Sequence, residues 1–316
     1  MQAVEYNAAG AFVCRFFLGL SEAGFGPVIP FYYNLFYLKP ELGLRTTIFI
    51  AAAPIAGAFS GLIAYGVQLI KTDMDNWRIL FLIEGLPTIL MAFVVLFFLP
   101  SRVEITKLFN EDERLVAISR MNRESTREAI GYINWRHGFS ALYDYKVWLI
   151  ALIYQSNNVM LSSISNFLVP ILEEMGYEGA DAQLYSVWPY LCAGGFMIGL
   201  SIFSDRVQLR GPFITFSLIL SGVGYAMLLG LPVKALKARY GAIFLSVMGS
   251  YTAVPLSMVW VTSNAGSETK KAIGMALLNS IGHCMSVLGS YIYTDAEAPE
   301  YTRGLLLNSF FVTFIK

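Results

Sequence analysis

Long stretches without any charged residue dominate this sequence. A helix of roughly 18 to 20 apolar residues is long enough to cross the ~30 Å hydrocarbon layer of a membrane. The stretches that contain no Asp, Glu, Lys or Arg and exceed this length are 46–70, 147–172, 182–204, 211–233 and 240–267. Because a lipid layer offers no water to backbone groups, each of these stretches is predicted to be a helix.

Three further apolar stretches carry isolated ionisable residues. They are 6–38, with Arg15 and Glu22, 79–101, with Glu84, and 272–294, with His283. A ninth apolar run begins at Gly304. The sequence therefore predicts an all-α membrane protein with eight full transmembrane helices and a partial ninth. Composition agrees, because only 14% of the residues are charged, against about a quarter in soluble domains.

Charge and cysteine content argue against several other classes of protein. The formal net charge is zero, which gives no support for a nucleic-acid partner. Cys14, Cys192 and Cys284 are odd in number and lie in apolar stretches, so neither a disulfide framework nor a metal cluster is predicted. A membrane enzyme would need clustered His, Asp or Cys at ligand spacing, and the spans hold a single histidine. No cofactor is predicted.

A mixed-charge segment at 101–146 divides the chain into two groups of spans. We expect a first helical bundle at 1–100 with three spans, a linker of one or two helices at 101–146, and a second bundle at 147–316 with five spans and a truncated sixth. Most loop lysines and arginines share one side with this linker, which predicts that the linker is cytoplasmic. In that orientation Met1 lies outside, so we expect the carrier to have further helices at both ends.

Several motifs of the first half resemble a known family. Arg15-x-x-x-Gly19-x-x-Glu22-Ala23-Gly24-x-x-Pro27 resembles the fourth helix of major facilitator carriers and, more narrowly, the anion:cation symporter family. The fungal branch of that family, the allantoate, nicotinate and pantothenate permeases, is similar at 33–45, at 56–65, and at Trp77-Arg78 with Ile83-Glu84-Gly85.

The second half continues the resemblance. The matching segments are Asp205-Arg206 with 210–214, Asn264-Ala265-Gly266, Lys270-Lys271, Ser280-Ile281-Gly282, and 289–293 with Ala298-Pro299-x-Tyr301. His283 stands where the family often has Asn. The resemblance implies a major facilitator helical bundle that lacks the first three helices and part of the twelfth. It also implies a multi-pass carrier of the plasma membrane.

Ionisable residues inside spans are the first candidates for a functional site, because a charge there costs about 2.5–3.5 kcal/mol on insertion scales. Glu22 lies near the middle of its span, where desolvation would let it hold a proton. The resemblance implies a proton-coupling role for Glu22 and marks Arg15 as a motif residue. His283 shares a helix face with Asn279 and could titrate between pH 5 and 8. A structural carboxylate and a neutral, packed histidine are the alternatives.

Polar and aromatic side chains in the second half are candidates for substrate binding. Gln155, Asn158 and Ser162, with Ser165, are spaced by three and four, so they share one helix face that must point to protein or to a water-filled cavity. Interhelical hydrogen bonding is the alternative. Asn279 joins these candidates, and Trp188 and Tyr190 could stack on an aromatic substrate or simply pack.

Charged residues at helix ends are candidates for a gate. Asp205, Arg206 and Arg210 follow one span, and Glu41 and Arg45 precede another, all on the side predicted to be cytoplasmic. Plain positive-inside anchoring would explain the arginines and not Asp205.

Together these features predict a secondary active transporter. Proton-coupled symport of a small organic anion, such as nicotinate, pantothenate or allantoate, is the main hypothesis. Its partners are then the anion, protons and the lipid bilayer. The alternative is an inert, truncated fragment of such a carrier.

Overall fold

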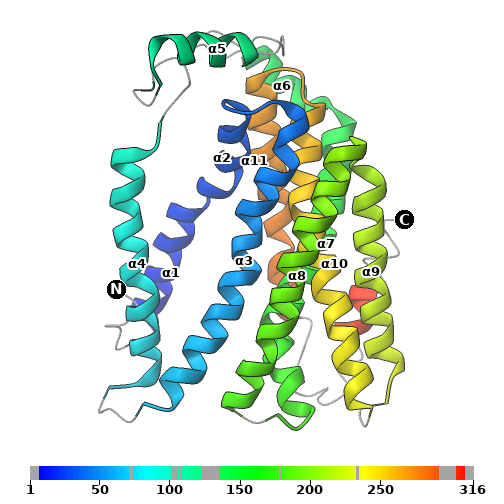
Figure 1. Cartoon of the computed structure of the whole chain (residues 1–316). Coiled ribbons are helices and arrows are strands. Elements are labelled where there is room, and N and C mark those ends of the chain that lie inside the picture. Colours follow the sequence, from blue (N-terminus) through cyan, green and yellow to red (C-terminus); the bar gives the residue numbers. More distant parts are fainter. Residues whose placement is uncertain are drawn as a thin grey trace.

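The chain is almost entirely helical in the computed structural model (Figure 1), which describes residues 7–70, 74–100, 106, 109–121, 135–177, 179–232, 235–291 and 304–309. Its helices are α1 (Ala8–Glu22), α2 (Phe25–Asn34), α3 (Lys39–Gln68), α4 (Asn76–Phe98), α5 (Glu111–Met121), α6 (Trp135–Tyr143), α7 (Tyr145–Glu174), α8 (Ala180–Val207), α9 (Gly211–Gly230), α10 (Leu236–Asn264), α11 (Glu268–Cys284) and α12 (Ser286–Tyr291). A further helical turn covers residues 304–309.

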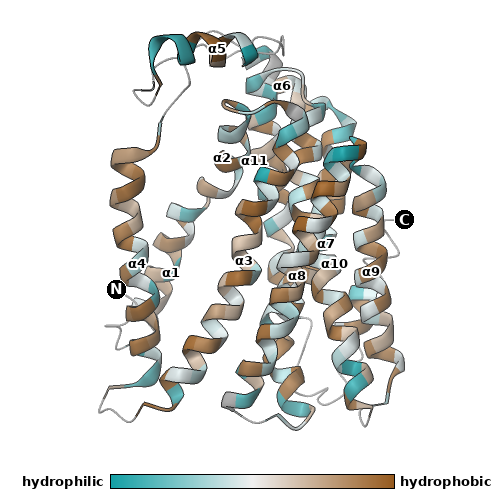
Figure 2. Cartoon of the chain, in the orientation of Figure 1, coloured by the Kyte–Doolittle hydropathy of each residue, from teal (hydrophilic) through white to brown (hydrophobic). Residues whose placement is uncertain are grey.

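Eight candidate membrane spans lie within the described residues, as predicted. The pairs α1–α2 and α11–α12 each form one span, and α3, α4 and α7–α10 form one span each. Hydrophobic residues prevail along α4, whereas hydrophilic residues occur on parts of α5 and at the helix ends (Figure 2). We call the end of the molecule that carries α5 and α6 the linker end, and the opposite end the far end (Figure 1).

The hydrophobic core lies mainly in the second group of helices, α7 to α12. Its main cluster centres on fully buried side chains of α7, α9 and α10, among them Leu168, Leu218 and Ile243. In contrast, α1 and α4 contribute no buried residue. The first group, α1 to α4, therefore packs on the rest of the described chain mainly through α2 and α3.

Helix α3 lies along α8 and forms the main contact between the two groups (Figure 1). Small residues allow this approach, as their spacing in the sequence suggests. A Cβ atom at Gly57 would lie 3.6 Å from the ring of Tyr190, and one at Gly61 would lie 3.1 Å from the Gln183 carbonyl oxygen. The groups thus meet through close helix packing.

The linker contacts both groups at the linker end. Arg120 of α5 forms an ion pair with Glu41 in the first turn of α3. Helix α6 packs on α11, where a Cβ atom at Gly138 would come within 3.3 Å of the Thr269 methyl group. The linker therefore bridges the two groups of spans through two helices.

Candidate functional site

The helix of the α1–α2 span is interrupted next to Glu22. Glu22 is the last residue of α1, and α2 begins at Phe25. Pro27 has no N–H to donate to the Ala23 carbonyl four residues earlier, which interrupts the helical hydrogen bonds. The carboxyl group of Glu22 is thereby placed at a helix break within the span.

The helix of the α11–α12 span is interrupted next to His283. Helix α11 ends at Cys284, and α12 begins at Ser286. The Ser286 hydroxyl donates a hydrogen bond to the His283 carbonyl oxygen at 2.7 Å, which satisfies a carbonyl at this helix end. Broken helices that lie within membrane spans and carry ionisable groups are a recurrent feature of transporter sites.

The two breaks face one another. The Glu22 carboxylate is close enough to His283 to interact with it electrostatically. A cavity of about 400 Å³ lies beside them, lined by Ala23, Gly24 and Pro27 on one side and by Asn279 and His283 on the other. The helix breaks next to Glu22 and His283, two residues predicted separately from the sequence, therefore border one cavity between different groups of helices.

The surroundings of Glu22 differ from the sequence-based expectation of a desolvated acid. Within the described residues Glu22 is exposed, as are most residues of α1. Arg15, on the same helix, lies two turns away. The described part of the chain thus leaves the Glu22 carboxylate uncovered at the helix break.

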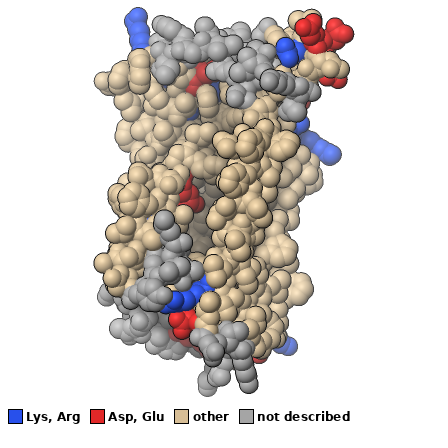
Figure 3. Space-filling view, turned by 90° about the vertical axis from the view of Figure 1, so that its left-hand side faces the viewer, with Lys and Arg blue, Asp and Glu red and all other residues tan. Residues whose placement is uncertain are grey.

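Arg15 lines a different cavity, between α1 and α4. This groove has a volume of about 1080 Å³ and is also lined by Glu84. The Arg15 guanidinium lies over the Phe81 ring at 5.9 Å, and Glu84 accepts a hydrogen bond of 2.7 Å from the Ser60 hydroxyl. The bond to Ser60 gives Glu84 a partner on the neighbouring helix α3. Figure 3 shows this face of the molecule as hollowed, with acidic side chains along the hollow.

The polar stripe of α7 makes mostly interhelical hydrogen bonds. Ser162 pairs with Ser290 of α12 at 3.2 Å, and Ser165 pairs with the Tyr251 hydroxyl of α10 at 3.2 Å. Asn158 is buried and donates to the Tyr154 carbonyl at 2.9 Å. Gln155 is half-buried. Ser162 and Ser165 thus form hydrogen bonds between helices, which was the alternative to lining a substrate cavity.

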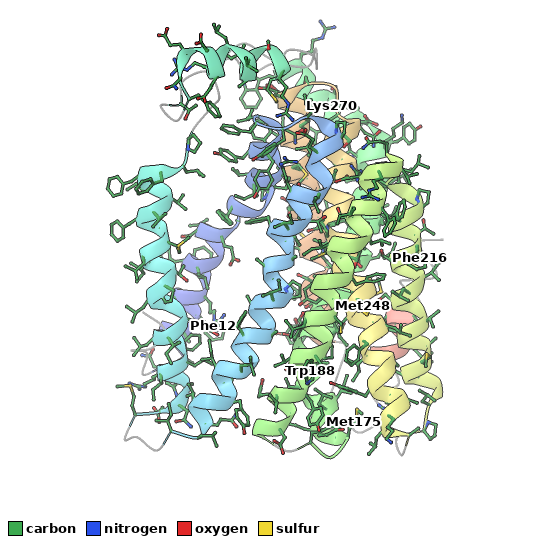
Figure 4. The ribbon with its side chains drawn as sticks, viewed as in Figure 1. Phe12, Met175, Trp188, Phe216, Met248 and Lys270 are labelled. Carbon is green, nitrogen blue, oxygen red and sulfur yellow. The ribbon has the colours of Figure 1, made fainter. Side chains whose placement is uncertain are left out.

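Trp188 and Tyr190 lie on different faces of α8. Tyr190 is buried, packs against Gly57 of α3 and meets the Tyr251 ring at 5.9 Å. Trp188 is 56% exposed and lies in the half of α8 nearer the far end (Figure 4). The structure therefore brings Tyr190, and not Trp188, to the contact between the two groups.

A network of polar contacts joins the two groups at the linker end. The Asp205 carboxylate of α8 accepts a hydrogen bond of 2.6 Å from the Leu44 N–H of α3 and forms an ion pair with Arg210. Arg210 also donates to the Ser204 hydroxyl at 3.0 Å. A Cβ atom at Gly43 would overlap the Asp205 carboxylate, so glycine permits this contact.

The other predicted gate residues lie around this network. Arg45 stacks over the Tyr37 ring at 4.0 Å and donates to the Glu41 carbonyl at 3.1 Å. Glu41 pairs with Arg120 of the linker. Arg206 is exposed, so of the two arginines near Asp205 it is Arg210 that takes part.

Sequence reasoning did not assign several residues that bridge the groups. The Thr47 hydroxyl donates to the Ser201 hydroxyl at 2.8 Å, and both side chains are buried. The Lys271 ammonium group donates to the Asn34 side-chain oxygen at 3.3 Å. Neither Thr47 nor Ser201 has a sequence signal of its own. Lys271 is a charged residue beside an apolar span, so the sequence offered a signal that it bridges two helices.

The helical architecture, the broken spans and the contact between two groups of helices are those of a membrane transporter bundle. The sequence profile described as Major Facilitator Superfamily matches residues 6–290. The chain belongs to the major facilitator superfamily, and it is a multi-pass membrane protein.

Its relatives are fungal transporters of this superfamily. The chain is 32% identical over 313 residues to the MFS-type transporter efuF of Hormonema carpetanum, which covers 98% of this chain and 64% of the relative. It is 26% identical over 308 residues to the high-affinity nicotinic acid transporter of Saccharomyces cerevisiae, covering 98% of this chain and 57% of the relative. The chain thus spans about three fifths of the length of these relatives.

Proposed function

We propose that this chain is part of a secondary active transporter that couples uptake of a small organic anion to protons by alternating access. The observation that carries the proposal is a cavity at which two helix breaks meet, one next to Glu22 and one next to His283, from different groups of helices. A carboxylate and an imidazole can each gain or lose a proton, which is what coupling requires.

A carboxylate substrate suits the same region. Glu22 can release its negative charge by taking up a proton, and His283 and Asn279 offer hydrogen-bond donors at the adjacent cavity. An anion and a proton that enter together leave the site with little net charge when it reorients. The name of the yeast relative supports a monocarboxylate such as nicotinate as the first compound to test.

The network at the linker end supports the alternating-access part of the proposal. Its contacts, from Leu44 to Asp205 and from Thr47 to Ser201, hold α3 against α8. We propose that the linker end faces the cytoplasm of a plasma-membrane carrier. These contacts would then close the inner gate and separate when the anion is released.

Uptake of labelled anions tests this function. The complete reading frame that encodes the chain would be expressed in a yeast strain without nicotinate, pantothenate and allantoate permeases. We expect one of these anions to accumulate faster at acidic external pH, and Glu22→Gln to abolish the acceleration. Glu84→Gln, which changes an acid held by Ser60, serves as the matched control. Uptake that is equally pH-dependent in Glu22→Gln would remove Glu22 from coupling.

A further inference from the structure

Asn279 presents a hydrogen-bond acceptor at the contact between α11 and α2. Its side chain is 7% exposed, and its Nδ2 group donates a hydrogen bond of 3.0 Å to the Met275 carbonyl oxygen of its own helix. A carbonyl oxygen can only accept, so this bond fixes which end of the amide is the nitrogen. The side-chain oxygen Oδ1 is left over, and within the described residues no hydrogen bond reaches it.

A glycine keeps the space in front of this oxygen open. A Cβ atom at Gly26 of α2 would lie 3.6 Å from Oδ1, which is van der Waals contact. With glycine at this position, the oxygen faces a gap and not a methyl group. A largely buried acceptor that lacks a partner forgoes the hydrogen bonds it would make in water, so a ligand that brings an N–H or O–H group would bind favourably here.

The cavity beside Asn279 limits what such a ligand can be. The cavity has a volume of about 400 Å³, and most of its walls are apolar, with Val28 and Phe31 of α2 opposite Ala276 of α11. Its other polar residues among those described are Ser280 and His283, and a hydroxyl or an imidazole can either donate or accept. The fixed requirement is therefore one donor, placed at Asn279, on a small body that is otherwise mostly apolar.

We propose that Asn279 determines specificity, and that its Oδ1 atom accepts an amide N–H from the transported carboxylate. The inference rests on the proposed function and deepens it, because it separates the candidate anions by their chemistry. Pantothenate carries one amide N–H and allantoate carries several ureido N–H groups, whereas the nicotinate anion carries none. The apolar walls would leave most N–H groups of allantoate without acceptors, so a carboxylate with a single amide fits the cavity best.

Two probes that differ at a single group test this inference. In N-acetyl-β-alanine an amide N–H lies on a short arm that ends in a carboxylate, and in β-acetoxypropionate an ester oxygen replaces this N–H. Isothermal titration calorimetry on the purified complete carrier in lipid nanodiscs would give both dissociation constants, independently of transport. We expect the amide to bind about 10- to 100-fold more tightly than the ester, because the ester leaves a buried acceptor unpaired.

Two variants locate this preference at the oxygen. Asn279→Leu removes Oδ1 and should bring the two affinities to within about twofold of each other. Gly26→Ala keeps Asn279 and its bond to Met275 but sets a methyl group against Oδ1, so it should weaken the amide more than the ester, and it serves if Asn279→Leu does not fold. Gly19→Ala is the matched control, since it adds a methyl group to the same span where no described atom lies within 4 Å.

Three results would overturn the role of Asn279: equal binding of the two probes by the wild type, a preference for the amide that persists in Asn279→Leu, or binding of neither probe. Each of them leaves the proposed function standing if the carrier still accumulates one of the three anions at acidic external pH. Selective binding of the amide by a carrier that accumulates none of these anions would instead contradict the transport proposal and support the role of Asn279.

Discussion

Single glycines decide how closely α9 and α10 approach. A Cβ atom at Gly249 of α10 would overlap the backbone of Ser217 and Ser221 on α9, and one at Gly224 of α9 would overlap the backbone of α10. Around them, the Ser221 and Ser250 hydroxyls lie 2.8 Å apart in the buried interior. Small residues let two membrane helices approach until their backbones touch.

Gly249→Ala is therefore expected to destabilise the protein by about 1–3 kcal/mol, because the backbone of α9 must move to make room. Gly241→Ala in the same helix is the control, since no atom lies within 4 Å of its Cβ position. Thermal unfolding of the detergent-solubilised variants would compare them. Equal stability of the two variants would contradict the close packing.

Candidate site residues could be chosen from the sequence, but their surroundings could not. Glu22 and His283 stand out because each is an ionisable residue within an apolar stretch. That the helix breaks beside them border one cavity depends on how α2 and α11 pack, although the two residues lie more than 250 positions apart in the chain. Trp188 and Tyr190 are the opposite case. They are two positions apart in the sequence, yet helix geometry places their side chains on different faces.

Helix α7 begins with a cap that also connects it to α11. The Asp144 carboxylate accepts a hydrogen bond of 3.0 Å from the Lys146 N–H and one of 2.7 Å from the Lys270 ammonium group. Its hydrogen bond with Lys270 lowers the pKa of Asp144 below its ordinary value. Two helices of the second group are thus joined at the linker end.

Asp144→Asn keeps the capping oxygen and removes the ion pair. We expect a loss of up to about 1 kcal/mol at neutral pH, as for solvent-accessible pairs. Because the folded-state pKa is lowered, this stabilisation is present above the unfolded-state pKa of about 3.9 and disappears as pH falls through the folded-state value. Unfolding curves recorded from neutral to acidic pH would therefore converge for the variant and the wild type.

Asp75→Asn is the matched control for this element, because Asp75 pairs with Arg78 while 62% of its side chain is exposed. It should change stability little at any pH. A difference between Asp144→Asn and the wild type that persists at the lowest pH would contradict the role assigned to Lys270.

The spans themselves were predictable, and their interruptions were less so. Charge-free runs locate helices because lipid leaves the backbone no alternative. The break after Glu22 has a signal in Pro27, but proline occurs inside other helices of this chain that stay continuous, such as Pro54 in α3. The break at Met285 has no proline or glycine beside it. Packing, and not local sequence, sets that position.

At the scale of the whole molecule, α3 and α8 hold the two groups together. Thr47 and Ser201 meet near the linker end, with 2.8 Å between their hydroxyl oxygens. If transport requires this end to open, a covalent bond here should stop it. Cysteines at these two positions would place their sulfur atoms close together, so that a small adjustment brings them to the S–S bond length of about 2.05 Å.

Oxidation of the Thr47→Cys/Ser201→Cys double variant, in a background without the native cysteines, is expected to reduce uptake to background, and reduction should restore it. Each single variant treated in the same way is the control. Full uptake by the oxidised, cross-linked protein would show that these two positions do not separate during the cycle.

The uneven distribution of buried residues sets the order in which the chain can assemble. Ribosomes deliver α1 to α4 to the membrane before α7 to α12, yet α1 and α4 bury nothing within the described residues and α3 finds its main neighbour in α8. Helix α3 ends at Gln68, whereas α8 begins at Ala180, so more than a hundred further residues must be synthesised before that neighbour exists. Helix α3 thus enters the bilayer well before its main neighbour among the described helices.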